Sequence, residues 1–160
     1  MKKKKVIDYL NATHLELNRL GMETILFNYS PEIASILKGH LLIERILETL
    51  IRKNIEHAER FLDKNRITFE MKIDLVNALG LLPNAHLGAA KALNKIRNSY
   101  AHDENYELSF GELNSLKVYW EDIQDQAYEA ACAKGIEEAA TMAVIFLHWT
   151  FLRLIHPNPE

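Results

Sequence analysis

The sequence predicts an all-α protein, and three observations lead to this fold class. The 160 residues include only six glycines and four prolines, so residues that interrupt helices are rare. No apolar run alternates with polar residues for long enough to indicate a β-strand. Hydrophobic residues form 48% and charged residues 26% of the chain, which is typical of a soluble globular domain. We therefore expect residues 1–160 to fold as a single domain, a bundle of about five to six helices.

Capping and turn residues predict where each helix begins and ends. Proline suits the first turn of a helix, so Tyr29-Ser30-Pro31 should separate the first helix from the second. Thr68 is the expected N-cap of the third helix, which ends before Gly80. Ser109 and Glu112 have the spacing of a capping box for the fifth helix, and Gly135 separates it from the sixth. The expected helices cover about residues 4–27, 31–61, 69–79, 86–100, 109–134 and 136–156.

The last of these helices, over residues 136–156, is the most apolar segment of the chain. Its stretch from Ala139 to Ile155 is interrupted by His148 and Arg153 and is shorter than the roughly 20 residues that span a bilayer. We therefore expect no membrane contact. The helix should close the core of the monomer, form a homodimer interface, or do both.

Charge and cysteine content exclude several classes of protein. Nineteen Lys and Arg against 22 Asp and Glu give a net charge of −3, so a nucleic-acid site, if there is one, must be a local basic surface. The single cysteine, Cys132, excludes an intrachain disulfide framework and any metal site with several cysteines. Lys2 to Lys5 are followed by a polar segment that is unlike a signal peptide. The expected location is the cytoplasm, and no cofactor is indicated.

Two polar residues lie where the second helix should be buried. His40 and Glu44 are four residues apart, hence neighbours, in the middle of its apolar stripe. A carboxylate in such a stripe must find a partner or become protonated. The two side chains could satisfy each other or nearby backbone, they could be two ligands of a metal, or Glu44 could hold a cation from another helix. No motif supplies further ligands, so no metal site is expected. The stripe consists of Ile33, Ile36, Leu37, Leu47 and Ile51.

A second polar group ends the fourth helix. Arg97 lies about 40° from Leu93 in helical projection, so it borders the buried face and can reach inward. His102 follows five residues later, which corresponds to a rotation of about 140° in a continuous helix. Arg97 and His102 would then not share a face. Either the helix stops near Ala101, or the two residues work together across two chains.

These residues resemble the HEPN superfamily of all-α domains, whose mark is an Arg followed by a polar residue and, after four to six intervening residues, a His. Arg97, Asn98 and His102 fit this pattern. The resemblance covers about residues 35–115 and is strongest toward the branch that contains the mannitol-operon repressor family and related bacterial proteins. It rests on the segments Gly39–Arg45, Phe69–Leu75, Ala78–Gly80 and Ala92–Asn98.

The resemblance implies a homodimer that brings two copies of the motif into one cleft, and a metal-independent endoribonuclease of the toxin or defence type acting on single-stranded RNA. His102 would then be the general acid or base, Arg97 would stabilise charge on the scissile phosphate, and Asn98 would orient the phosphate or the imidazole. Glu44, with His40 beside it, would position Arg97. Lys91 and Lys95 would guide the RNA backbone. An antitoxin or another protein partner is also implied.

Two other interpretations use the same residues. In the first, the chain is a non-catalytic regulator or protein-interaction module of the mannitol-repressor type, because a fold does not determine a function. In the second, the motif is structural: Arg97 pairs with Glu44, and His102 interacts with the dipole at the C-terminus of its helix.

Overall fold

The computed structural model describes residues 12–13, 15–16, 19, 30–64 and 66–157. The chain divides into two compact units, residues 1–31 and 32–160. In the first unit, Thr13 and Glu16 cap a helical turn, because the Thr13 amide donates to Glu16 Oε2 at 2.8 Å and the Glu16 amide donates to Thr13 Oγ1 at 3.3 Å. The expected helix over residues 4–27 lies largely outside the described residues.

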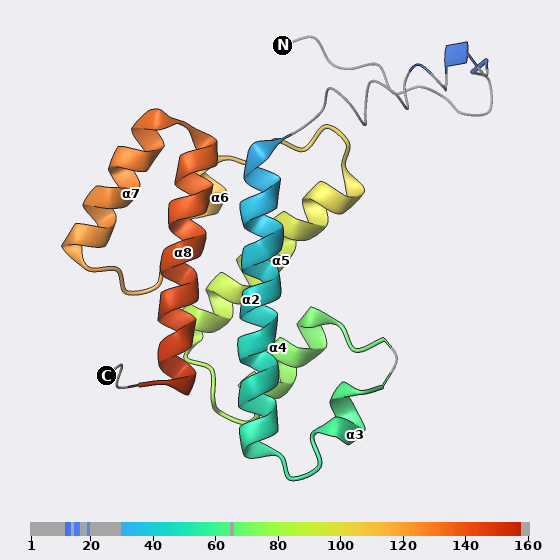
Figure 1. Ribbon diagram of the computed structural model, residues 1–160, viewed down its shortest axis with the longest axis vertical. Helices are drawn as coiled ribbons and strands as arrows, with labels where there is room; N and C mark the ends of the chain where they lie inside the picture. The colour runs from blue at the N-terminus through green and yellow to red at the C-terminus, as the bar shows by residue number, and fades with distance from the viewer. Residues whose placement is uncertain (1–11, 14, 17–18, 20–29, 65, 158–160) are drawn as a thin grey trace. The chain divides into compact units, whose positions relative to one another are not determined.

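The described part of the chain is helical and contains no strand, so the all-α prediction is confirmed. Short turns and loops join its helices (Figure 1). These helices are α2 (Pro31–Asn54), α3 (Glu59–Leu62), α4 (Phe69–Ala78), α5 (Asn84–His102), α6 (Phe110–Asn114), α7 (Asp122–Lys134) and α8 (Ile136–Ile155).

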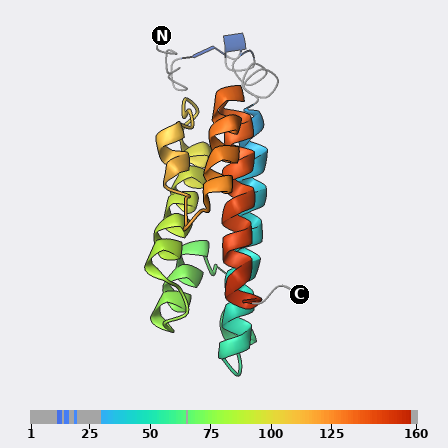
Figure 2. The ribbon, with the colours of Figure 1, turned by 90° about the vertical axis from the view of Figure 1, so that its left-hand side faces the viewer.

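The long helices of residues 32–160 form two layers. Helices α2 and α8 run side by side in one layer, and α4 and α5 lie in the other (Figures 1 and 2). Gly39 of α2 packs so closely on α8 that a Cβ at this position would overlap with Val144. The core between the layers is apolar, with several large side chains fully buried. They include Ile36, Ile43, Leu47, Ile73, Leu93, Leu147 and Phe151.

The expected caps are present. The Thr68 hydroxyl accepts a hydrogen bond from the Met71 amide at 3.2 Å and begins α4. Ser109 and Glu112 form the capping box of α6. Gly135 adopts a φ of 140° between α7 and α8, a backbone conformation that favours glycine. These three predictions are confirmed. Each depends only on residues a few positions apart, so the sequence alone was sufficient to make it.

The expected second helix, 31–61, is too long. Helix α2 ends at Asn54, whose side-chain amide donates to the Leu50 carbonyl at 2.8 Å. The chain then turns, and Ala58, only 4% exposed, and the partly buried Phe61 pack on the core. A straight helix would carry Phe61 about 10 Å beyond Asn54 along the axis and away from these contacts. Burial therefore ends the helix early.

The expected fifth helix, 109–134, is two helices. Helix α6 ends at Asn114, and a segment containing Tyr119 precedes α7. Tyr119 has a φ of 48°, which is incompatible with a right-handed helix. A second capping box, between Glu121 and Gln124, then begins α7. The fourth helix also differs, because α5 continues to His102 rather than ending near Tyr100.

The apolar last helix is part of the monomer core. Seven of its residues are buried, among them Leu147 and Phe151, whereas Ile145 and Trp149 on the same helix are exposed. By length and composition α8 is also long and apolar enough to cross a membrane, a test that core helices pass as well.

Leu37, which was expected in the buried stripe of α2, is 46% exposed, and that prediction is wrong.

Candidate functional site

Two adjoining cavities lie along α4 and α5, and together they are lined by every residue that the sequence analysis selected for the site. The first cavity, of about 500 Å³, is lined by Lys91, Lys95 and His102. The second, of about 420 Å³, is lined by Arg97 and, on α2, by His40 and Glu44. The residues common to both cavities are Glu70, Asn94 and Asn98.

The helical period of α5 explains this division. Lys91, Lys95, Asn98 and His102 are spaced by three or four residues, so they form one stripe that faces the first cavity. Arg97 is rotated by about 100° from Asn98 and faces the second cavity. Because α5 is helical through both Arg97 and His102, these two side chains diverge by about 140° and their Cα atoms are separated by about 7.5 Å along the axis. Asn98 lies between them.

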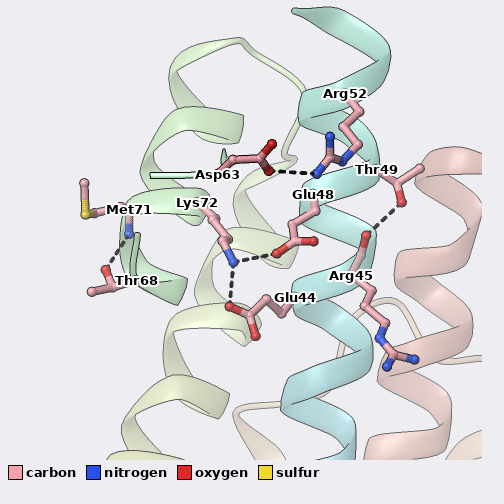
Figure 3. A network of polar contacts seen from close by, with 9 residues as sticks. All are labelled: Glu44, Arg45, Glu48, Thr49, Arg52, Asp63, Thr68, Met71 and Lys72. Carbon is pink, nitrogen blue, oxygen red and sulfur yellow. Dashed lines mark hydrogen bonds and ion pairs between the residues drawn. The ribbon is translucent and has the colours of Figure 1, made fainter. Parts of the chain in front are cut away.

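Glu44 is held by a lysine that the sequence analysis did not select. Lys72 of α4 donates from Nζ to Glu44 Oε1 at 2.7 Å and to Glu48 Oε1 at 2.6 Å (Figure 3). The Lys72 side chain is 8% exposed, and those of Glu44 and Glu48 are 25% and 33% exposed. The expectation that Glu44 positions Arg97 is therefore wrong: the cation does come from another helix, but it is Lys72.

The electrostatics of this network keep Lys72 charged. Burial alone would lower the pKa of Lys72, but the hydrogen bonds and charges of Glu44 and Glu48 outweigh it and raise the pKa above the ordinary value. A sequence signal for this residue does exist. Lys72 lies in the apolar stripe of α4 beside Phe69 and Val76, where a lysine needs a buried carboxylate as its partner.

His40 is bound to α5 rather than to Glu44. Its Nε2 lies 3.1 Å from Asn94 Oδ1, and its ring stacks on Phe69 with centroids 3.9 Å apart. Burial lowers the pKa of His40 and outweighs the hydrogen bond to Asn94, which raises it. The imidazole is therefore neutral at pH 7 and donates its Nε2 hydrogen to Asn94. The expected mutual pairing of His40 and Glu44 is not formed.

Arg97 is half-buried and keeps its charge available. Its Nη1 donates to Asn98 Oδ1 at 3.0 Å. Among the residues that the structure describes, no carboxylate lies within ion-pair distance of Arg97, and Glu44 pairs with Lys72 instead. The Arg97–Glu44 pair of the structural interpretation is therefore not formed, whereas His102 does lie at the C-terminus of its helix, as that interpretation expects. A guanidinium in this state offers its remaining N–H groups to a bound anion.

His102 is accessible to solvent. It is the last residue of α5, its side chain is exposed, and Asp103 follows as the C-cap. Lys91 and Lys95 are also exposed, so the first cavity has two solvent-accessible cations and an imidazole, and Glu70 of α4 lines it as well. The two cavities together present cations, amides and imidazoles, which suit a phosphodiester backbone, beside the carboxylates of Glu44, Glu70 and Asp103.

Comparison of the chain with protein families, curated proteins and solved structures found no match.

Proposed function

We propose that the two cavities bind single-stranded RNA and cleave it without a metal ion, as in the HEPN-type endoribonucleases that the sequence resembles. The observation that carries the proposal is the state of Arg97, a half-buried guanidinium that no described carboxylate neutralises. It lies beside Asn98, which also lines the cavity of His102. Arginine suits a transition state with charge on phosphate, because it can bind two oxygens and does not lose its proton.

The chemistry is an internal transfer. His102 removes the proton of a ribose 2′-hydroxyl, and the resulting oxygen attacks the adjacent phosphorus. The P–O5′ bond breaks, the leaving oxygen takes a proton from water, and the products carry a 2′,3′-cyclic phosphate and a 5′-hydroxyl. Arg97 stabilises the charge that develops on the phosphate oxygens, and Asn98 orients the phosphate. Lys91 and Lys95 bind neighbouring phosphates and position the strand.

A second copy of the chain would complete the site. Arg97 and His102 of one helix diverge by about 140°, so they approach one phosphate from different cavities. A symmetric dimer would bring the His102 side of one α5 toward the Arg97 side of the other. The working pair then comes from two protomers.

The first test is cleavage of a labelled single-stranded RNA in EDTA by the wild type and by Arg97→Ala and His102→Ala. Both variants should lose at least about 100-fold in rate, because each removes a group that acts in the transition state. Arg60→Ala and His57→Ala are matched controls, since both residues are exposed and line neither cavity. Cleavage that survives both site variants, with folded protein confirmed by circular dichroism, would refute the proposal.

Mixing the two inactive variants tests the dimer. If Arg97 of one protomer works with His102 of the other, a dimer of one Arg97→Ala chain and one His102→Ala chain has one intact site of its two. Random mixing makes half of all dimers of this kind. An equal mixture of Arg97→Ala and His102→Ala should then recover about a quarter of the wild-type activity. No recovery, with mixed dimers shown by native mass spectrometry, would place both residues in one chain.

A further inference from the structure

A third cavity lies between the start of α5, the residues around the start of α7 and the C-terminal half of α8. Its volume is about 220 Å³, and none of its lining residues lines the two cavities of the proposed RNA site. The residues that matter for its chemistry are His86, Tyr119, Gln124, Trp149 and Arg153.

His86 forms a buried wall of this cavity. It is the third residue of α5 and only 7% exposed, and its ring packs on Phe151 with centroids 5.2 Å apart. Burial lowers the pKa of His86 and outweighs a backbone hydrogen bond with Thr150, which raises it. The ring is therefore uncharged at pH 7 and gives the cavity a flat wall.

Two aromatic side chains border the cavity and remain exposed. Trp149 of α8 is 51% exposed, and Tyr119 is 78% exposed with its ring centroid 6.4 Å from that of His86. Tyr119 has a φ of 48°, a conformation that is unfavourable for a residue with a side chain. Such strain persists where the surroundings hold it, and it is frequent at ligand sites. Both aromatic side chains are therefore available to contact a ring bound in the cavity.

The cavity also carries a positive charge. Arg153 lies on the exposed side of α8, and within the described ranges no carboxylate is close enough to form an ion pair with it. The side-chain amide of Gln124, near the start of α7, adds a donor and an acceptor. No acidic residue lines the cavity, so an anion meets no repelling charge there.

We propose that this cavity binds a small aromatic carboxylate. The ring lies against Trp149 and Tyr119, the carboxylate binds Arg153, and the side-chain amide of Gln124 offers it a further donor. The volume limits the ligand to a small molecule, because drug-sized ligands occupy about 300–1,000 Å³. The site is separate from the RNA cavities, so its occupancy does not depend on RNA cleavage.

The test uses benzoate as the probe and the indole N–H signals of ¹⁵N-labelled full-length protein as the readout. The chain has two tryptophans, and the Trp149 signal is assigned by its loss in Trp149→Phe. Benzoate should shift this signal saturably. Benzyl alcohol lacks the charge and cyclohexanecarboxylate lacks the aromatic ring, so both should bind at least about tenfold more weakly.

Arg153→Gln should weaken benzoate binding about tenfold, which is the loss expected for one charge-assisted hydrogen bond. Arg60→Gln, an exposed arginine of α3 outside the cavity, should leave it unchanged. Both substitutions are at exposed positions, so the folded protein is retained. Absence of a saturable Trp149 shift up to tens of millimolar benzoate would overturn the proposal. Equal binding by wild type and Arg153→Gln would overturn it as well.

Discussion

Replacing Lys72 by Met removes the cation that joins α4 to α2 and keeps most of the side-chain volume. Two short hydrogen bonds, at 2.7 Å to Glu44 and 2.6 Å to Glu48, are lost together. The substitution leaves two carboxylates four residues apart on one helix face, where like charges repel. We expect the folded state to be weakened more than by the loss of a surface ion pair.

The magnitude follows from burial. Removing one partner of a fully buried ion pair costs about 3–5 kcal/mol. Lys72 is 8% exposed, but Glu44 and Glu48 are 25% and 33% exposed and regain part of their hydration when the lysine is absent. The expected loss is therefore at the lower end, about 3 kcal/mol of the free energy of unfolding. Adding Glu44→Gln and Glu48→Gln removes the uncompensated charges and should restore most of it.

Urea denaturation at pH 7.5, followed by circular dichroism, measures these differences. Lys64→Met is the matched control at an exposed lysine and should change the free energy of unfolding by less than about 0.5 kcal/mol. The pKa of Lys72 is raised in the folded state, so its contribution is complete below the ordinary value of 10.5 and disappears as the pH rises through the folded-state pKa. A loss below about 0.5 kcal/mol for Lys72→Met, or no recovery in the triple variant, would refute the reasoning.

Two further predictions concern packing and protonation. Gly39→Ala should lower the free energy of unfolding by about 1–3 kcal/mol, because the new methyl overlaps with Val144. Gly88→Ala adds a methyl in open space and should raise the free energy of unfolding by up to about 1 kcal/mol. Equal effects of the two substitutions in urea denaturation would contradict this prediction. Burial lowers the pKa values of His40 and His86. Below the ordinary value of 6.5 the unfolded state therefore binds more protons than the folded state, so the free energy of unfolding falls as the pH falls. Each histidine contributes a decrease of up to about 1.4 kcal/mol per pH unit. His86→Gln should flatten this slope between pH 7.5 and 5, and an unchanged slope would argue against it.

Local chemistry made part of the fold predictable. Thr68, Ser109 and Gly135 mark helix ends through hydrogen bonds or backbone angles within a few residues. The residues around each position are therefore sufficient to predict the helix end. The end of α2 at Asn54 has a different origin. It depends on the return of Ala58 and Phe61 to a core built from distant segments. The sequence near Asn54 therefore does not predict where α2 ends.

The candidate site shows the same limit. Helical periodicity predicted that Arg97 borders the buried face of its helix, and in the structure Arg97 is half-buried and lines one of the two cavities. Periodicity gives the direction of a side chain but not its neighbour on another helix. The register between α2 and α4 decides that Glu44 meets Lys72, and no other carboxylate in the described part of the chain pairs with Arg97.

The most direct measurement is the chemical identity of the RNA ends that the wild-type protein produces in EDTA. Purified protein is incubated with a single-stranded RNA, and the products are analysed by mass spectrometry. The account predicts 2′,3′-cyclic phosphate and 5′-hydroxyl ends, which are absent when the protein carries Arg97→Ala or His102→Ala. No cleavage, or products with 3′-hydroxyl and 5′-phosphate ends, would contradict it.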